Sequence, residues 1–176
     1  MKILITGSYC SGKTTLAGQL HSVLPGSILA GEVTREVLRL FGRVDWSIPE
    51  LRAYIFIRQL MEEKIASSSS VSDVIVDAGI ISIIAHDRIL SKSVPDRLEL
   101  LKYFKHTAYD VVLFCDHEEI PIIDDGERYT DQELRDVLAS VVEETLQSLE
   151  IRDYVVMRGT RTERLKLAME AIKQKV

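Results

Sequence analysis

The residues best suited to chemistry lie in one short segment, residues 7–14, whose sequence is GSYCSGKT. Its two spaced glycines followed by lysine and threonine form the pattern of a Walker A phosphate-binding loop. Gly7 and Gly12 permit backbone conformations in which consecutive N–H groups turn inward on a phosphate. Lys13 adds a positive charge for the β- and γ-phosphates, and Thr14 offers its hydroxyl to Mg²⁺. We therefore expect MgATP to bind here, through Gly7, Ser8, Tyr9, Cys10, Ser11, Gly12, Lys13, Thr14 and Thr15.

The setting of this segment strengthens the prediction. An apolar run over residues 2–6 precedes it and a helical pattern over residues 13–23 follows, so the loop joins a strand to a helix. The positive N-terminal end of that helix would face the same phosphate oxygens. A chance match has odds of roughly one in a hundred or less, so a glycine-rich turn that binds nothing is the weaker interpretation. Cys10 is either filler at a tolerant position or a redox-sensitive thiol.

A second candidate residue, Asp77, closes the apolar strand pattern of residues 71–78. Such a run ending in an acid resembles Walker B, whose aspartate lies beside the phosphate loop and holds Mg²⁺, here through a water molecule. Any buried strand can end in Asp, so the pattern alone is weak. Its combination with the phosphate loop predicts that Thr14 and Asp77 together hold the metal.

A segment with both acidic and basic residues, 31–36, follows a short strand pattern at residues 27–30. Loops at the carboxyl ends of parallel strands line the ligand crevice. Glu32 could accept a proton from a substrate hydroxyl, and Arg35 could hold an anionic or polar substrate group. The alternative is a solvated helix start with acids in its first turn, and the sequence leaves both open. A lone aromatic further along, Trp46, either stacks on a planar substrate or packs.

A polar segment at residues 116–130, DHEEIPIIDDGERYT, has no clear periodicity. Loops of this length are usually functional or mobile. In a phosphotransfer enzyme it would form a lid, and the Arg128 guanidinium would stabilise charge on the transferring phosphoryl group. The alternative is an Asp-Gly turn with a surface arginine.

The elements that must position these residues alternate between strand and helix. Strands are expected at residues 2–6, 27–30, 71–78, 110–115 and 154–157. Helices are expected at 13–23, from about 32 to 40, from 49 to about 65, and at 79–90, 96–104, 131–149 and 161–176, with a serine connector at 67–70. This order predicts an α/β chain with the three-layer P-loop NTPase fold, a mainly parallel five-stranded sheet and one domain spanning residues 1–176.

Three short patterns predict how helices begin. Ser47–Glu50, Thr130–Glu133 and Thr160–Glu163 each have the Ser/Thr-x-x-Glu spacing of a capping box. Within the second long helix, Arg58 and Glu62 are spaced for an i, i+4 ion pair.

Composition limits the classes of function. The chain of 176 residues is 46% hydrophobic and 28% charged, with a net charge of −5, which argues weakly against a nucleic-acid surface. Cys10 and Cys115 make no disulfide framework, so a reduced, cytoplasmic setting is expected. The four histidines show no metal-binding spacing and are expected to be ordinary surface or core residues. No apolar run has the length of a secretory signal or membrane span.

Four segments, GSYCSGKTTLA, GEVTREVL, VIVDAGIIS and IPIIDDGERYTD, occur in this order. Together they resemble the small P-loop kinases typified by the nicotinamide riboside kinase domain of bacterial NAD-biosynthesis regulators, often grouped as an AAA-type ATPase domain. The resemblance implies that Glu32, Arg35 and Glu36 line the acceptor site and that Asp77 serves metal or substrate hydroxyls. It also implies that the lid carries Asp124, Asp125 and Arg128. One departure is Gly79, where these kinases often carry a second acid.

The leading hypothesis is an ATP-dependent kinase that phosphorylates a hydroxyl of a nucleoside or riboside. Lys13, Glu32, Asp77 and Arg128 would be catalytic, and Glu32, Arg35, Glu36 and Asp125 would bind the acceptor. The alternatives are a nucleoside monophosphate kinase, an ATPase switch acting on a protein, and a binding module without turnover. The only partner expected is the small-molecule acceptor, with no nucleic acid and no membrane, whereas the oligomeric state and the choice between ATP and GTP stay open.

Overall fold

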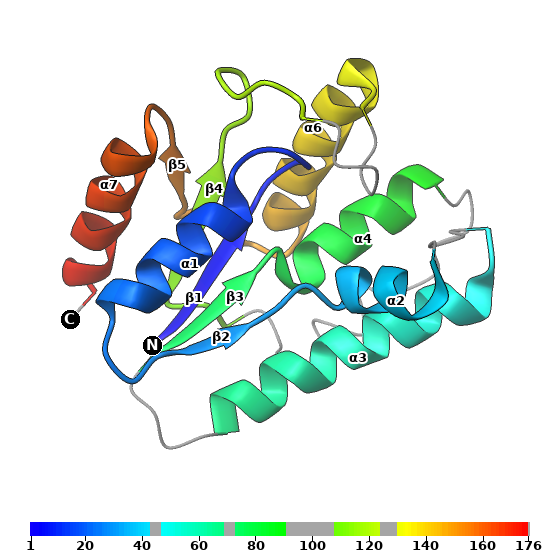
Figure 1. Cartoon of the computed structure of the whole chain (residues 1–176), viewed down its shortest axis with the longest axis horizontal. Helices are drawn as coiled ribbons and strands as arrows, with labels where there is room; N and C mark the ends of the chain where they lie inside the picture. The colour runs from blue at the N-terminus through cyan, green and yellow to red at the C-terminus, as the bar shows by residue number, and fades with distance from the viewer. Residues whose placement is uncertain (43–46, 69–72, 91–107, 124–129, 176) are drawn as a thin grey trace.

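The apolar run at the N-terminus forms the central strand of a sheet. In the computed structural model, which describes residues 1–42, 47–68, 73–90, 108–123 and 130–175, five strands pair in the order β2-β3-β1-β4-β5. Every neighbouring pair is parallel, so the fold predicted from alternating strands and helices is confirmed (Figure 1). The strands are β1 (Lys2–Thr6), β2 (Ile28–Ala30), β3 (Val74–Asp77), β4 (Val111–Cys115) and β5 (Val155–Met157).

The register of β1 determines which residues meet at the carboxyl edge of the sheet. Ile5 pairs with Asp77 on β3, and Thr6 pairs with Phe114 on β4. Since the segment from Gly7 starts where β1 ends, it lies beside the ends of both neighbouring strands. This is the edge at which open parallel sheets bind ligands.

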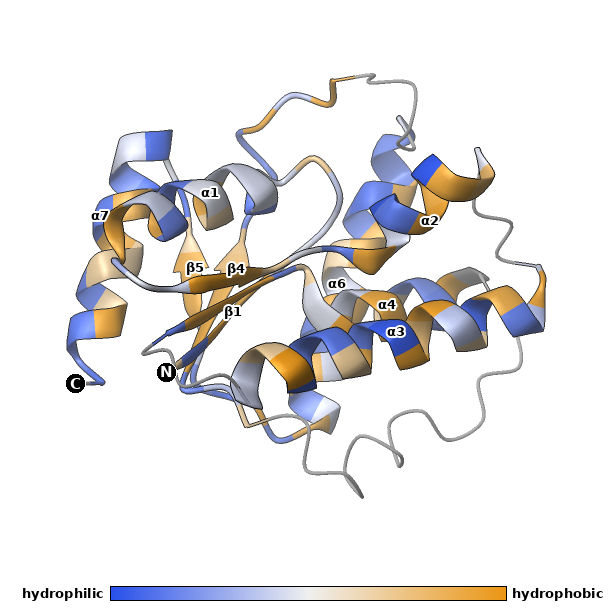
Figure 2. Cartoon of the chain, turned by 60° about the horizontal axis from the view of Figure 1, so that its bottom comes forward, coloured by the Kyte–Doolittle hydropathy of each residue, from blue (hydrophilic) through white to orange (hydrophobic). Residues whose placement is uncertain are grey.

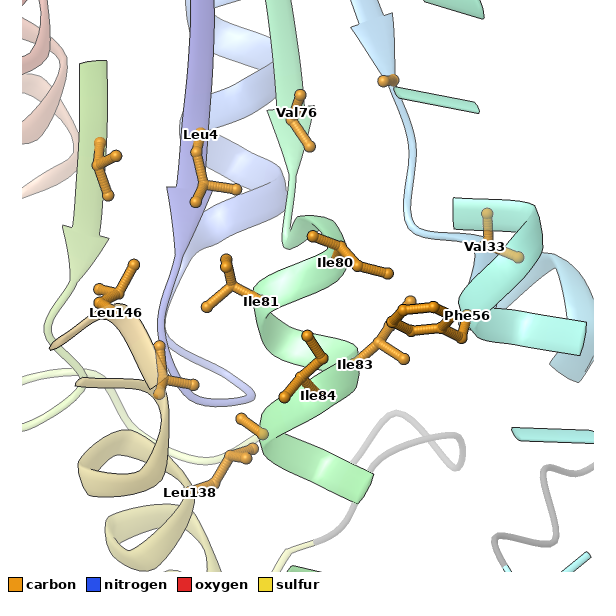
Figure 3. Packing of buried hydrophobic residues seen from close by; sticks show 14 of the residues in the cluster. Leu4, Val33, Phe56, Val76, Ile80, Ile81, Ile83, Ile84, Leu138 and Leu146 are labelled. Carbon is orange, nitrogen blue, oxygen red and sulfur yellow. The ribbon is translucent and has the colours of Figure 1, made fainter. Parts of the chain in front are cut away.

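Helices cover both faces of the sheet and make three layers (Figures 1 and 2). One core packs alternate strand residues such as Ile3 and Ile5 against two helices, α1 (Lys13–Val23) and α7 (Arg161–Lys173). The other core packs the intervening residues, among them Leu4 and Val76, under the remaining helices (Figure 3). These are α2 (Val33–Phe41), α3 (Pro49–Ser68), α4 (Gly79–Leu90) and α6 (Gln132–Ser148).

Helix starts follow the predicted caps in one case and differ in another. The capping box of Thr160 and Glu163 is present at the start of α7. At α6 the predicted cap, Thr130, is wrong, because Asp131 is the N-cap and its carboxylate accepts from the Leu134 N–H. Asp is among the preferred N-cap residues, and its negative charge also interacts favourably with the positive helix end. The box at residues 47–50 stays a prediction.

Two further expectations need correction. Arg58 donates to Glu36 on α2 at 3.0 Å, across two helices, instead of pairing with Glu62 one turn along its own helix. Ser67 and Ser68 belong to α3, and their hydroxyls donate to carbonyls one turn back, so the helix extends into the expected connector.

Some predictions fall outside the described residues. These are the helix at 96–104, Trp46 and the lid residues Asp124, Asp125 and Arg128. Among the described helices, none has the length and apolarity required to traverse a bilayer.

Candidate functional site

The turn between β1 and α1 has the backbone of a phosphate cradle. Gly7 and Gly12 have positive φ angles of 134° and 85°, and Cys10 also lies in the left-handed region. A Cβ placed on Gly7 would lie 2.5 Å from the Cys115 carbonyl oxygen, so only glycine fits between the loop and β4. No side chain caps the first turn of α1 and no acid lies in it, which leaves the positive helix end available to an anion.

Side chains inside the loop hold its shape. The Ser11 hydroxyl donates to the Ser8 carbonyl at 2.7 Å, and the Lys13 ammonium group donates to the same oxygen at 2.5 Å. The Ser8 hydroxyl donates to the Arg135 carbonyl on α6 at 2.6 Å, and Tyr9 donates to the Asp131 carbonyl. The loop is therefore braced from within and from the start of α6, with Lys13 curled over it.

Two buried arginines that the sequence analysis did not identify complete this support. Arg135 donates to the carbonyls of Cys10, His117 and Ile120 at 2.8 to 3.0 Å. Arg164 donates to the carbonyls of Ser11, Asp116 and Gly159 at the same distances. Each guanidinium thus ties the phosphate loop to the segment after β4. Their only sequence signal is an arginine at a core position of an amphipathic helix.

Asp77 lies at the carboxyl end of β3, beside the loop. It is 4% exposed, the Thr14 side chain lies close enough to act on its pKa, and its Oδ1 has no hydrogen-bond partner among the described residues. Burial and the Glu32 carboxylate raise the pKa of Asp77, although Lys13 opposes them. A buried, orphaned carboxylate oxygen next to a threonine hydroxyl suits Mg²⁺, which prefers oxygen ligands. Thr14 and Asp77 therefore fit the metal that the sequence predicts.

A tight turn from β3 into α4 fixes the direction of Asp77. Ala78 and Gly79 both have positive φ angles, of 64° and 59°. A Cβ on Gly79 would lie 2.7 Å from Leu4 Cδ1, which explains why no second acid stands at this position. Glu63 on α3, which is fully buried, accepts from the Ile80 N–H at 2.8 Å and so anchors the turn.

Charges on the other side of Glu63 balance its carboxylate. Its Oε2 accepts from Lys2 Nζ and from the Tyr109 hydroxyl, each at 2.8 Å. The Lys2 ammonium also lies 4.5 Å from the centre of the Tyr109 ring. This buried network is structural, because it supports the site through backbone groups, at Ile80 directly and at Val33 through Gln59.

The charged residues after β2 form two separate ion pairs. Glu32 is the N-cap residue of α2 and pairs with Arg35 at 3.1 Å. Both residues act on the pKa of Asp77, so the structure brings them close to the phosphate loop. Glu36 instead pairs with Arg58 on α3, with half of its side chain exposed. The ion pair directs the Glu36 carboxylate toward α3.

His86 on α4 also belongs to this site, although the sequence analysis treated it as an ordinary histidine. Its Nδ1 donates to the Ser82 carbonyl at 2.8 Å. Burial lowers the pKa of His86; the Ser82 carbonyl and Glu32 oppose this shift, and Lys13 adds to it. The neighbouring Asp87 pairs with Arg52 at 3.0 Å in a buried bridge between α3 and α4. His86 therefore joins the charged groups of the site, whereas Asp87 stabilises the scaffold.

The start of the predicted lid is fixed to the body of the protein. Asp116 pairs with Arg158 at 2.6 Å. Burial opposes ionisation of Asp116, but the Glu118 N–H and Arg158 together lower its pKa. The carbonyls of residues 116, 117 and 120 are bound to Arg164 and Arg135, so this first part of the segment is held beside the phosphate loop.

Comparison with solved structures places this geometry among P-loop proteins. A NadR protein in complex with NR matches with a TM-score of 0.76 and 22% identity over 97% of this chain and 51% of that chain. Thymidylate kinase from Candida albicans matches with a TM-score of 0.70 and 20% identity, over 98% and 91% of the two chains. Deoxyadenosine kinase from M. mycoides with bound products matches with a TM-score of 0.66 and 13% identity, over 99% and 100%. At these identities the matches show a shared fold.

The match to NadR confirms the resemblance predicted from the four sequence segments, and the chain spans about half the length of that protein. No curated protein sequence matched the chain. A family model described as an AAA domain matches residues 2–164. The chain therefore belongs to the AAA domain family.

Proposed function

We propose that the protein is an ATP-dependent kinase that transfers the γ-phosphoryl group to a hydroxyl of a nucleoside- or riboside-type acceptor. The observation that carries the proposal is the grouping of Lys13, Thr14, Glu32 and the orphaned Asp77 oxygen around one phosphate cradle. Phosphoryl transfer depends mainly on positioning and charge stabilisation, so a few such groups suffice.

In this proposal residues 7–15 hold the triphosphate through backbone N–H groups, and Lys13 neutralises charge on the transferring group. Thr14 and Asp77 would hold Mg²⁺, which would supply positive charge to the phosphate groups. Arg128, Asp124 and Asp125 belong to the lid at residues 116–130, and Arg128 adds positive charge when the lid covers the site.

Glu32 is the favoured base. Asp77 is assigned to the metal, whereas among the described residues Glu32 is bonded through Oε2 alone, to Arg35, so its second oxygen can accept the acceptor's proton. Arg35 then holds Glu32 in place and binds polar groups of the acceptor, and Glu36 supports this edge of the site through Arg58.

The charge of the site favours a neutral or cationic acceptor over a nucleoside monophosphate. Arg35, which lies next to Glu32, and Arg58 are each already paired with a glutamate. A dianionic phosphate would need an unpaired cation, whereas ribose hydroxyls are suited to carboxylate acceptors. The NadR structure in complex with NR supports the same riboside class. Free buried cysteines fit a reducing compartment such as the cytoplasm.

A mass-spectrometric acceptor screen tests the proposal. Purified protein and MgATP are incubated with a pool of nucleosides, nicotinamide riboside and nucleoside monophosphates. We expect a nucleoside or riboside to gain one phosphoryl group, and Lys13→Ala to abolish the product while circular dichroism stays unchanged. Phosphorylation of a monophosphate would favour the nucleoside monophosphate kinase. ADP without a phosphorylated acceptor would favour an ATPase switch acting on a protein, and absence of ADP would favour a binding module.

A further inference from the structure

The solvent side of α3 carries an apolar stripe that none of the groups in the proposed function uses. Tyr54, Ile57, Met61 and Ile65 are 45%, 54%, 50% and 63% exposed. Four large apolar side chains this exposed on one helix exceed what scattered surface residues explain. The stripe therefore suggests an interface.

Three of the four stripe residues follow the spacing of a helix-pairing seam, and Ile65 lies at its edge. Exposed residues recur at intervals of four and three along α3, at Glu50, Tyr54, Ile57, Met61, Lys64 and Ser68, a set that we call the α3 seam. An alternation of four and three keeps one line of side chains facing a neighbouring helix. The seam spans nearly all of this 20-residue helix, which is about 30 Å long.

The charges of the α3 seam specify both the partner and its direction. Glu50 lies in the first turn and Lys64 near the last turn, and among the described residues neither forms an ion pair. A parallel copy of α3 would place like charges together. An antiparallel copy places Glu50 one layer from Lys64 of the partner subunit, so the seam is complementary to itself only in that direction.

We propose that the protein forms a twofold homodimer through antiparallel pairing of the α3 seams. The twofold axis passes between Ile57 and Met61, so that each of these residues packs on the other type in the second copy. Tyr54 then packs along the stem of Lys64 of the partner subunit, with the ammonium group near Glu50. A symmetric interface of this kind is the commonest form of homo-oligomer.

Apolar side chains beside the seam enlarge the surface that a second copy would cover. Arg58 flanks the seam and binds Glu36 on α2 at 3.0 Å. Leu40 lies one helical turn after Glu36, and Leu40 and Phe41 are 64% and 65% exposed. A stable interface buries roughly 800 Å² per partner, so the end of α2 would contribute along with α3.

The arrangement leaves the phosphate cradle accessible. Gln59 and Glu63 lie on the inward side of α3, where they bind the backbone of α2 and α4. The α3 seam is on the opposite side, so dimerisation does not need the site to be covered. The proposal is therefore independent of the proposed function.

Analytical ultracentrifugation of the full chain at roughly 1–50 µM tests the dimer, because the population of a dimer depends on protein concentration. We expect a dimer that Ile57→Glu converts to monomer. Val137→Glu is the matched control, since Val137 on α6 is also exposed, at 44%, and lies outside the seam. A monomeric wild-type protein, or a dimer unaffected by Ile57→Glu, would overturn the proposal.

Charge reversal tests the antiparallel direction. Glu50→Lys and Lys64→Glu alone should each weaken the dimer about tenfold or less, because each places like charges together. The double variant restores opposite charges and should recover most of the lost affinity. If the loss of dimer affinity in the double variant equalled the two single losses added together, the antiparallel arrangement would be wrong.

Discussion

At the scale of single residues, the site separates two carboxylates by their surroundings. Asp77 is buried, with its pKa raised by burial and by Glu32, while Glu32 is one-quarter exposed and paired with Arg35. Different environments give neighbouring acids different tasks. The buried acid suits a metal, whose positive charge favours the ionised carboxylate, and the more accessible acid suits an exchanging substrate hydroxyl.

This division predicts different kinetic defects for two isosteric variants. Asp77→Asn should raise the Mg²⁺ concentration for half-maximal activity about 10- to 100-fold, as loss of a supporting metal contact does. Glu32→Gln should lower kcat about a hundredfold or more with little change in that Mg²⁺ concentration. Magnesium titrations of kcat for both variants provide the measurement. Identical Mg²⁺ dependence in both would assign the metal elsewhere.

His86 predicts a pH-dependent stability. Its pKa is lowered from 6.5 in the folded protein, mainly by burial, so the neutral ring is favoured by folding. The contribution is complete above the unfolded pKa near 6.5 and is lost as pH falls below it. Between pH 7.5 and 5.5, wild type should lose more unfolding free energy than His86→Gln. Urea titrations at both pH values measure this, and parallel losses would contradict it.

The residues of this site were predictable from sequence to different degrees. Glu32, Asp77 and the phosphate loop follow from motifs in which neighbouring residues share one task. Arg135 and Arg164 reach loop carbonyls that lie 125 and 153 residues away in sequence. No local pattern encodes such a contact, because its partner is a backbone oxygen that any residue type provides. The role of Glu63 could not be predicted for the same reason, since it binds the backbone of residue 80.

At the scale of elements, α6 and α7 do more than cover the sheet. Each inserts one arginine between the phosphate loop and the segment after β4. Planar guanidinium groups can satisfy several carbonyls at once. The two helices thereby couple the shape of the loop to the start of the predicted lid.

Removing one of these arginines should therefore weaken both folding and nucleotide binding. Arg164→Met keeps much of the volume but leaves buried carbonyls without donors, which costs about 3 kcal/mol or more. KM for ATP should rise because the loop carbonyl of Ser11 is released. Arg161→Met is the matched control on α7, where Arg161 is exposed, and should change stability by no more than about 0.5 kcal/mol. Urea unfolding and ATP titrations measure both effects, and equal behaviour of the two variants would remove Arg164 from this role.

The elements themselves were largely predictable, because buried parallel strands and amphipathic helices have different periods. Where the prediction was wrong, two side chains could have made the same contact, and the sequence did not show which one would. Asp131 caps α6 in place of Thr130, and Arg58 bonds Glu36 on another helix in place of Glu62. In both cases two side chains of suitable chemistry were available, and packing of α2 and the entry angle of α6 selected one.

At the scale of the whole molecule, the site draws on both cores. The phosphate loop lies between β1 and α1, Glu32 follows β2, Asp77 ends β3, and the arginines come from α6 and α7. A ligand bound there contacts segments from most of the chain. Binding and global folding should therefore be thermodynamically linked.

This linkage gives the final prediction. At MgATP concentrations about 100 times its dissociation constant, the unfolding free energy should rise by about 2.7 kcal/mol. Lys13→Ala should fold in the absence of nucleotide but lose most of this increase, since its ammonium group no longer meets the phosphates. Thermal unfolding with and without MgATP measures the effect, and Lys173→Ala, a lysine in the last turn of α7, is the matched control. If MgATP stabilised Lys13→Ala as strongly as wild type, the nucleotide would bind outside the phosphate loop. The site around Asp77 would then not be the nucleotide site.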